Sequence, residues 1–302
     1  MSLSTSDATA GVRLAHGHTG RLRQARYWRW ITSRGLIYLL VVAFAVVQVL
    51  PLAWMLTTAL KPDGEIVSIP PNFIPTTWRW RNFVTALDAM KFPILLKNTV
   101  TITAISLVGV LVSSSLVAYP FARLRFPGKS WLFLLVLSTM MLPYAVTMIP
   151  VYIVFAKMKW IDTFKPLIIP AFFGGGAFNI FLLRQFFMTI PRELDEAATI
   201  DGCGVMGVFW NVILPLAKPG LTAVAIFTFI GHWNDFLIPL LYLNSRDKMT
   251  LAVGLNLFRD QYATQWNYLM AASLVVMLPC AIIFIVAQRY FIEGIALSGI
   301  KG

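Results

Sequence analysis

Long apolar stretches, separated by short groups of charged residues, run through most of the chain. Six stretches contain no Asp, Glu, Lys or Arg, apart from one acid in the fifth. A charged side chain at the centre of a bilayer costs about 2.5 to 3.5 kcal/mol on insertion scales, so the charges mark the ends of membrane spans. The predicted spans are residues 35–60, 98–122, 130–156, 166–183, 219–245, which Asp235 interrupts, and 261–288.

An α-helix satisfies all its backbone hydrogen bonds within one segment, so each stretch is expected to cross the lipid as a helix. The predicted fold class is all-α, a polytopic membrane protein with six transmembrane helices. Helix-breaking residues interrupt several spans, and neighbouring helices or a wet cavity must then satisfy the freed backbone groups. This favours a helix bundle with a path through it; the breaking residues are Pro143, Pro150, Pro170, Pro239, Pro279 and the glycines at 174–176.

The composition agrees with a membrane location. Apolar residues make up 58% of the 302 residues and charged residues 13%, about half the usual share of a soluble protein. The net charge of +12 could indicate nucleic acid, but the basic residues flank apolar runs and form no patch with interleaved aromatics. Contact with anionic lipid is the expected role of these charges. The two cysteines, Cys203 and Cys280, fit neither a disulfide framework nor a metal-ligand spacing, so we expect free thiols and no metal.

Two parts are expected along the chain: a basic tail at 1–34 and a transmembrane domain at 35–302. The tail holds six arginines and one acid, Asp7. The first span is far longer than the roughly 7 to 15 apolar residues of a signal peptide, so it is read as a retained helix. One side of the predicted membrane carries 14 Lys and Arg and the other 11. By the positive-inside rule both termini, and the segment 185–218, are predicted to be cytoplasmic.

That segment has a helical pattern of its own. Pro191 suits a first helical position, Glu193, Asp195 and Glu196 complement the positive end of the helix dipole, and Gly202 can end the helix in a left-handed conformation. In a second helical piece Met206, Phe209, Trp210 and Ile213 form one apolar stripe. Such a face must be covered either by a groove of a partner protein or by the bilayer surface.

The same segment resembles the EAA loop of bacterial ABC-importer permeases. Glu196-Ala197-Ala198 is followed by Gly202 six positions after the glutamate and by Leu214-Pro215 eighteen and nineteen positions after it, with Val212 where the family usually has Ile. The resemblance extends over nearly the whole chain after the tail and is strongest to carbohydrate-uptake permeases of the maltose-system MalG type. It includes the residues 122–129, Trp233-Asn234-Asp235-Phe236, Thr250 to Gly254, and the ends at 288–291 and 299–302.

The resemblance implies a non-catalytic permease subunit of the bacterial inner membrane that imports a sugar or oligosaccharide. It would work with a second permease, two ATPase subunits that hold ATP and Mg²⁺, and an extracytoplasmic binding protein. In this family the EAA helix sits in a cleft of the ATPase. The ATPase-coupling residues would be Glu196, Ala197, Ala198, Asp201, Gly202, Leu214 and Pro215, with Met206, Phe209 and Trp210 as added docking contacts.

Two other groups of residues are candidates for contacts with cargo or partner. Trp233, Asn234 and Asp235 could line the substrate pathway, with the aromatic ring stacking on a sugar and the amide and acid bonding its hydroxyls, but interhelical hydrogen bonding or an interfacial position is the favoured explanation. Thr250, Leu251, Ala252, Val253 and Gly254 belong to a loop that in relatives reaches the binding protein, although an ordinary solvated loop would read the same. The resemblance does not fix the sugar, and glycerophosphodiester-like cargo stays open.

Two other classes of function compete with this interpretation. Asp235 and His232, three residues apart on a predicted helix, could relay protons in a secondary transporter, since an intramembrane acid is by default a functional candidate. That hypothesis leaves the EAA pattern unexplained. A membrane enzyme would need a nucleophile or metal constellation, and none emerges at usable spacing. Gly128-Lys129-Ser130 fails as a phosphate-binding loop because Arg123 stands where glycine is required.

Overall fold

The computed structural model describes residues 34–259 and 264–299, with side-chain surroundings up to residue 286. The predicted basic tail at 1–34 therefore lies almost entirely outside the described residues, as do residues 300–302. The chain divides into two compact units, residues 1–57 and 58–302. Among the described residues of the first unit one helix begins, Arg34–Ala59, and its 26 residues at 1.5 Å each span about 39 Å. This is enough to cross a bilayer core of about 30 Å.

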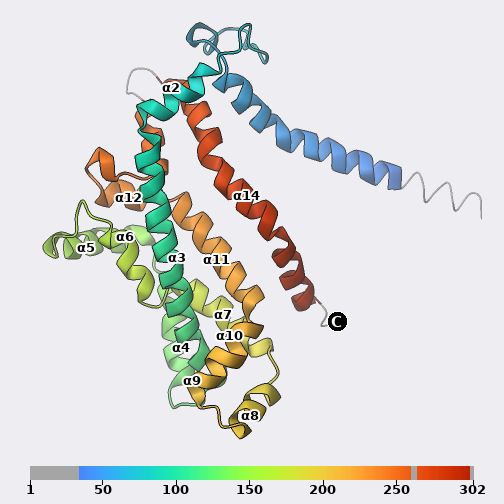
Figure 1. Ribbon diagram of the computed structural model, residues 1–302, viewed down its shortest axis with the longest axis vertical. Coiled ribbons are helices and arrows are strands. Elements are labelled where there is room, and N and C mark those ends of the chain that lie inside the picture. The colour runs from blue at the N-terminus through green and yellow to red at the C-terminus, as the bar shows by residue number, and fades with distance from the viewer. Residues whose placement is uncertain (1–33, 260–263, 300–302) are drawn as a thin grey trace, which may run out of the picture. The chain divides into compact units, whose positions relative to one another are not determined.

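The second unit is organised around the long helix α3 (Phe92–Arg123). Helices α7 (Ala177–Thr189) and α11 (Lys218–Trp233) pack against α3, and α14 (Trp266–Gly299) packs against α11 (Figure 1). Small polar residues let α3 approach its neighbours closely. Ser106 Oγ donates to Leu167 O at 3.2 Å and Ser113 Oγ to Ala171 O at 2.8 Å. These bonds fasten α3 to the segment that precedes α7.

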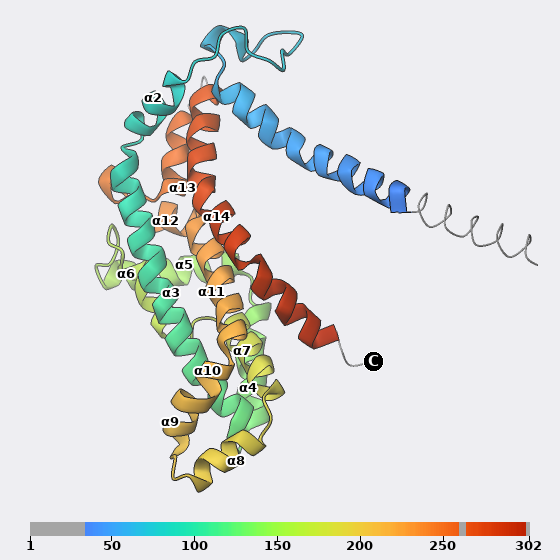
Figure 2. The same cartoon turned by 45° about the vertical axis from the view of Figure 1, so that its right-hand side comes forward.

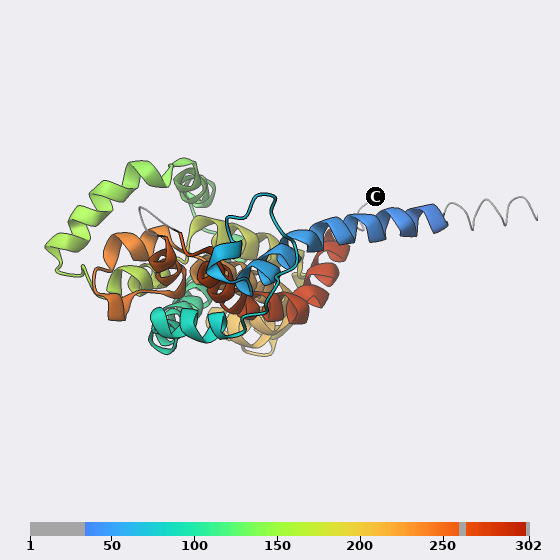
Figure 3. The ribbon, with the colours of Figure 1, turned by 90° about the horizontal axis from the view of Figure 1, so that it is seen from above.

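One predicted span is bent, and a second bend lies just before the predicted fifth span. Helices α4 (Lys129–Ser138) and η2 (Thr139–Met141) meet α5 (Tyr144–Lys157) at 96°. Pro143 explains the bend, because proline pushes the residue before it out of the helical region, and Leu142 is extended at ψ 114°. In the view of Figure 3, α5 lies at the edge of the second unit, away from α3. The second bend, of 75°, separates Val205–Leu216 from α11.

The span before the coupling segment is broken by glycines. Helices α6 (Lys165–Ile168) and η3 (Ile169–Phe172) precede α7, and Gly174, Gly175 and Gly176 between them all have positive φ. A Cβ at Gly175 would lie 2.9 Å from the carbonyl oxygen of Val110 on α3. Only glycine therefore allows the turn to sit against α3 in this left-handed conformation.

After α11 the chain folds through short pieces: α12 (Leu237–Tyr242), η5 (Arg246–Lys248), α13 (Leu251–Gly254) and η6 (Leu255–Phe258). Asp162, in the loop between α5 and α6, holds part of this region. Its carboxylate accepts hydrogen bonds from Ser245 Oγ at 2.6 Å, from the Asn244 and Ser245 amides, and from Lys248 Nζ at 2.8 Å. These contacts fix the loop that follows α12.

Two short helices lie near the start of the second unit, η1 (Asp63–Glu65) and α2 (Arg81–Ala89), and α2 packs against α14. Asn82 Nδ2 donates to Ala59 O at 2.9 Å and to Lys61 O at 3.0 Å. Within the second unit, α2 lies at one end of α3, and α8 (Glu193–Ile200) and α9 (Val205–Val208) lie at the other (Figures 1 and 2).

The all-α fold class is confirmed. Four helices of the described residues are long and apolar enough to span a membrane, and each bent pair can supply one more, which gives up to six. The predicted fifth span at 219–245 needs a correction, because the helix ends at Trp233. Asn234 and Asp235 leave the helix, and α12 starts only at Leu237. The second bent pair instead draws its extra length from the preceding residues, Val205–Leu216.

Candidate functional site: a coupling segment and an interior cavity

The predicted coupling segment forms α8, α9, the π-helix η4 (Phe209–Ile213) and α10 (Leu214–Leu216). Three acids, Glu193, Asp195 and Glu196, lie in the first turn of α8, where they complement the helix dipole. Helix α8 ends as the sequence predicts. Gly202 has φ +88°, its amide donates to Thr199 O, and the Cys203 amide donates to Ala198 O. This pair of bonds is a Schellman motif, which reverses the chain toward α9.

The apolar side chains of this segment face two ways. Met206 is 52% exposed and Trp210 54%, whereas Phe209 and Ile213 are buried in the protein's own core. The predicted single stripe is therefore wrong as a docking face, and Phe209 is unavailable to a partner in this conformation. Met206 and Trp210 lie four residues apart on one edge of the stripe, and Phe209 and Ile213 lie four apart on the other edge, which packs against the core.

Ile200 is an apolar group that the sequence pattern did not single out. It is 86% exposed at the last residue of α8. With Asp195, Glu196 and Thr199 it lines a shallow groove. The hydrophobic periodicity of the second helical piece did not include it, although an isoleucine next to the Asp201-Gly202 turn is a usable signal. Ile200, Met206 and Trp210 are named here the exposed apolar cluster.

Two side chains near the C-terminal end of α3 anchor the segment. Tyr119 OH donates to Val205 O at 3.1 Å, and the rings of Tyr119 and Phe209 lie 5.0 Å apart. Arg123, whose side chain is 3% exposed, lies with Nε 3.5 Å from Asp195 Oδ2 and donates through Nη2 to Ile190 O at 2.8 Å. The segment is thereby tied to α3 at both of its helical pieces.

Arg123 and Asp195 attract each other as opposite charges, but Arg123 Nε makes no hydrogen bond to the carboxylate. Arg123 Nε and Asp195 Oδ1 are buried and have no hydrogen-bond partner among the described residues. Burial raises the pKa of Asp195 above its usual value, and the nearby Arg123 charge opposes that rise. Neither residue's role in the interior was evident from the sequence, because the pairing joins positions 72 apart that only the tertiary fold brings together.

The remaining predicted coupling residues lie at the surface of the segment. Ala198 and Leu214 are half-buried, and the exposed ones are Glu196, Ala197, Asp201, Gly202 and Pro215. The small side chains of Ala197 and Ala198 allow another backbone to approach this surface of α8 closely. The segment therefore offers an acidic helix start, a smooth alanine surface and the exposed apolar cluster in one place.

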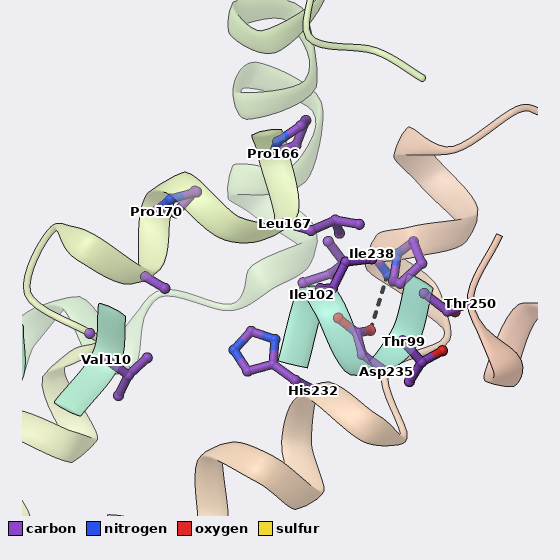
Figure 4. Close-up of a pocket in the computed structure, with 13 residues that line it drawn as sticks. Thr99, Ile102, Val110, Pro166, Leu167, Pro170, His232, Asp235, Ile238 and Thr250 are labelled. Carbon is purple, nitrogen blue, oxygen red and sulfur yellow. Dashed lines mark hydrogen bonds between the residues drawn. The ribbon is translucent and has the colours of Figure 1, made fainter. Parts of the chain in front are cut away.

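A second candidate site is a cavity of about 210 Å³ inside the second unit. Its walls come from α3, from α6 and η3, from Gly175, and from the chain between α11 and α13 (Figure 4). The polar lining residues are Thr99, His232, Asp235 and Thr250. Asp235 Oδ1 accepts a hydrogen bond from the Ile238 amide at 3.2 Å. No pattern in the sequence indicated that Thr99 and Thr250 share this site.

The three predicted pathway residues separate in the structure. Asp235 lines the cavity, but Trp233 is buried against α14, where Nε1 donates to Val276 O at 3.0 Å. Asn234 is exposed, and its amide donates to Ile230 O and lies 3.7 Å from Cys280 Sγ. His232 and Asp235 both line the cavity, yet they form no ion pair or hydrogen bond with each other among the described contacts.

The residues predicted for the binding-protein loop are mostly interior. Thr250, Leu251, Val253 and Gly254 are buried and Ala252 is half-buried, because α13 packs against α3. The Leu251 amide donates to Thr99 Oγ1 at 2.9 Å. The exposed part of this region is 244–247, where Lys91 Nζ and Asp247 Oδ1 pair at 2.9 Å.

Comparison with known proteins assigns the class. Residues 110–296 match the family of binding-protein-dependent transport system inner membrane components. The permease AraQ of an arabinooligosaccharide transport system in Halalkalibacterium halodurans is 35% identical over 90% of this chain and 99% of its own length. UgpE, a glycerol-3-phosphate transport permease of Yersinia pestis, is 33% identical over 82% of this chain and 90% of its own.

A solved structure of a bacterial alginate ABC importer has the same fold, with a TM-score of 0.74 at 22% identity, covering 96% of this chain and 99% of that chain. The chain belongs to the family of ABC-importer inner-membrane permeases. It is a multi-pass, non-catalytic membrane subunit of a binding-protein-dependent importer.

Proposed function

We propose that this permease forms half of the translocation pathway for a sugar or oligosaccharide and is driven by separate ATPase subunits through α8–α10. The carbohydrate systems of its relatives support the cargo class; the glycerol-3-phosphate permease among them is the competing precedent. The observation that carries the coupling role is the exposure of Ile200, Met206 and Trp210 on this helical segment, with Asp195 and Glu196 lining the groove beside Ile200. Exposed apolar groups next to polar ones are typical of a protein-docking surface.

The partners follow from this role. A second permease completes the pathway, two ATPase subunits bind ATP and Mg²⁺, and a binding protein delivers the cargo. In the orientation favoured by the Lys and Arg bias, both termini and α8–α10 lie on the cytoplasmic side of a bacterial inner membrane. The exposed residues at 244–247, next to the largely buried Thr250–Gly254, then face the binding protein. Of the three predicted pathway residues, Asp235 lines the cavity. Trp233 and Asn234 lie where α11 ends, and this helix end positions Asp235.

Docking would transmit force along a short path. A displacement of α8 by an ATPase acts on Asp195 and through it on Arg123 at the end of α3, and a displacement of α9 acts on Tyr119. Helix α3 also lines the cavity through Thr99, Ile102 and Val110. A movement of the coupling segment is therefore expected to change the cavity, which is what an alternating-access importer requires. The proton-relay hypothesis for Asp235 and His232 needs no ATPase and leaves this path without a purpose.

The proposal is tested by replacing exposed apolar groups with acids. We expect Ile200→Asp and Trp210→Asp each to remove the ATPase from the complex purified from native membranes, by at least about 30-fold, the effect of a typical interface hot spot of about 2 kcal/mol. Ile74→Asp is the matched control, since Ile74 is also exposed, at 68%, but lies outside the segment.

Uptake by reconstituted complexes should fall in parallel with ATPase retention. Retention of the ATPase and ATP-driven uptake by both cluster variants at the parent's level would contradict the coupling assignment. Uptake driven by a pH gradient without ATP would favour the proton-relay alternative instead.

A further inference from the structure

Two polar groups in the interior cavity have no hydrogen-bond partner among the described residues. Thr250 is 3% exposed and its Oγ1 is buried without a partner. Thr250 stands at the N-cap of α13, where a threonine hydroxyl commonly binds a backbone amide, yet it makes no cap bond. The ring nitrogens of His232 likewise have none among the described contacts. Because a buried unpaired hydroxyl is costly, these groups indicate that something else satisfies them.

The charge of the cavity lining has one sign. Asp235 is the acid, and no lysine or arginine stands among the lining residues. The Asp235 carboxylate accepts from the backbone amides of Ile238 and Leu237, but a carboxylate offers about four acceptor sites, so about half of its capacity remains. Thr99 is already occupied, since its Oγ1 accepts from the Leu251 amide and donates to Leu95 O. The hydrogen-bonding groups still available in the cavity are therefore acceptor sites on Asp235 and groups on Thr250 and His232 that can donate or accept (Figure 4).

This combination suits a hydroxyl better than an anion. A sugar hydroxyl donates one hydrogen bond and accepts others, so it can donate to Asp235 while a second hydroxyl accepts from Thr250 or His232. An ionised phosphate or carboxylate group offers only acceptors and no donor. It therefore cannot donate a hydrogen bond to Asp235, and its negative charge is repelled by the Asp235 carboxylate.

We propose that the cavity is a binding subsite for one uncharged, hydroxyl-bearing unit of the cargo, held by Asp235, Thr250 and His232. This inference rests on the proposed transport function and narrows its cargo to neutral sugars. The volume of about 210 Å³ is below the roughly 300 to 1,000 Å³ of pockets that enclose whole drug-sized ligands, so it suits one unit at the end of a chain.

The first experiment probes the cavity directly. In the assembled importer carrying Cys203→Ser and Cys280→Ser, Thr250→Cys is labelled with a cationic and an anionic methanethiosulfonate reagent. We expect severalfold faster labelling by the cationic reagent and loss of that difference when Asp235→Asn is added. Asparagine keeps the ability to accept from the Ile238 amide, so the local fold is retained. Arabinotriose or diacetylchitobiose should protect the cysteine, and glycerol 3-phosphate should not.

No labelling by either reagent, no protection by either neutral sugar, or better protection by glycerol 3-phosphate would overturn the subsite. These results are separable from failure of the transport proposal, which would appear as absent ATP-driven uptake in the parent importer. ATP-driven uptake combined with an unprotected cysteine refutes the subsite alone.

The second experiment separates binding from structure. Thr250→Val removes an unpaired hydroxyl without changing shape, so stability should stay the same or rise. If Thr250 binds cargo, the KM for uptake of the protecting sugar should rise about 2- to 10-fold, the effect of one net hydrogen bond. Thr103→Val is the matched control, because Thr103 is 2% exposed and its Oγ1 is also unpaired, but it does not line the cavity. Equal KM values for both variants and the parent would contradict the role of Thr250.

Discussion

The coupling segment leaves apolar side chains exposed, whereas the cavity buries polar ones without partners. Ile200 and Trp210 are more than half exposed at the end of α3 that carries α8, and Thr250 is almost fully buried beside the same helix further along. Each arrangement costs free energy in the isolated subunit, and each is relieved by a different kind of neighbour. An apolar surface needs a protein, and a polar cavity needs a hydrogen-bonding solute.

Helix α3 joins the two regions. The coupling segment is held by Tyr119 and Arg123 near the C-terminal end of α3, and the cavity is lined by Thr99, Ile102 and Val110 nearer its start. A rigid helix between them is a physical connection that can carry movement.

Removing the anchor should have the largest effect. We expect Asp195→Leu to destabilise the subunit by about 3 kcal/mol, because it leaves the buried Arg123 charge without its counter-ion. Glu193→Leu is the control, since Glu193 is an exposed acid in the same first turn of α8. Thermal unfolding in detergent measures the effect. An unchanged melting temperature for Asp195→Leu would show that the ion pair does not anchor the segment.

Straining the turn of the coupling segment should have an intermediate effect. Gly202→Ala forces a Cβ into a left-handed conformation, which costs about 1 to 2 kcal/mol. Gly204→Ala is closely matched, because both sites have open space around an added Cβ but Gly204 has an ordinary φ of −72°. We expect ATP-driven uptake to fall for Gly202→Ala only. Equal uptake by the two variants would mean that the geometry of this turn is not needed for coupling.

Loosening the loop after α12 should have the smallest effect. Hydrogen bonds from Lys248 and Ser245 hold the pKa of Asp162 well below 3.8. Since the folded pKa is lower than the unfolded one, the ionised carboxylate stabilises the fold above about pH 3.8, and that contribution is lost as the pH falls toward the folded value. We therefore expect Asp162→Asn to lower the melting temperature slightly at pH 7.

The difference in melting temperature between Asp162→Asn and the parent should shrink when both are measured below pH 3.8. Lys159→Gln is the control, because Lys159 and Asp162 lie close together in the chain and both have positive φ. It should show no such pH-dependent difference. A constant difference across this pH range would contradict the role assigned to the carboxylate.

Much of the fold could be predicted from the pattern of charges. Most of the spans and the helix end at Gly202 follow from local rules, because lipid excludes charge and a left-handed residue favours glycine. The bounds of the fifth span could not be predicted, since the chain between Asp235 and Ser245 is apolar enough for lipid but packs as α12 beside α6. Hydropathy measures transfer to an apolar medium and does not distinguish lipid from protein.

The sequence by itself determined the class of this protein, most of its helical spans and the two helical pieces of the segment proposed for coupling, because these depend on residues close together in the chain. Only the tertiary structure decided that Phe209 turns inward while Ile200 stays exposed, that Asp195 meets Arg123, and that Thr250 shares a cavity with Asp235. Those relations join distant positions or depend on which side of one helical turn packs against the core. A one-dimensional periodicity cannot contain them, because side-chain direction and packing are settled only when the helices meet.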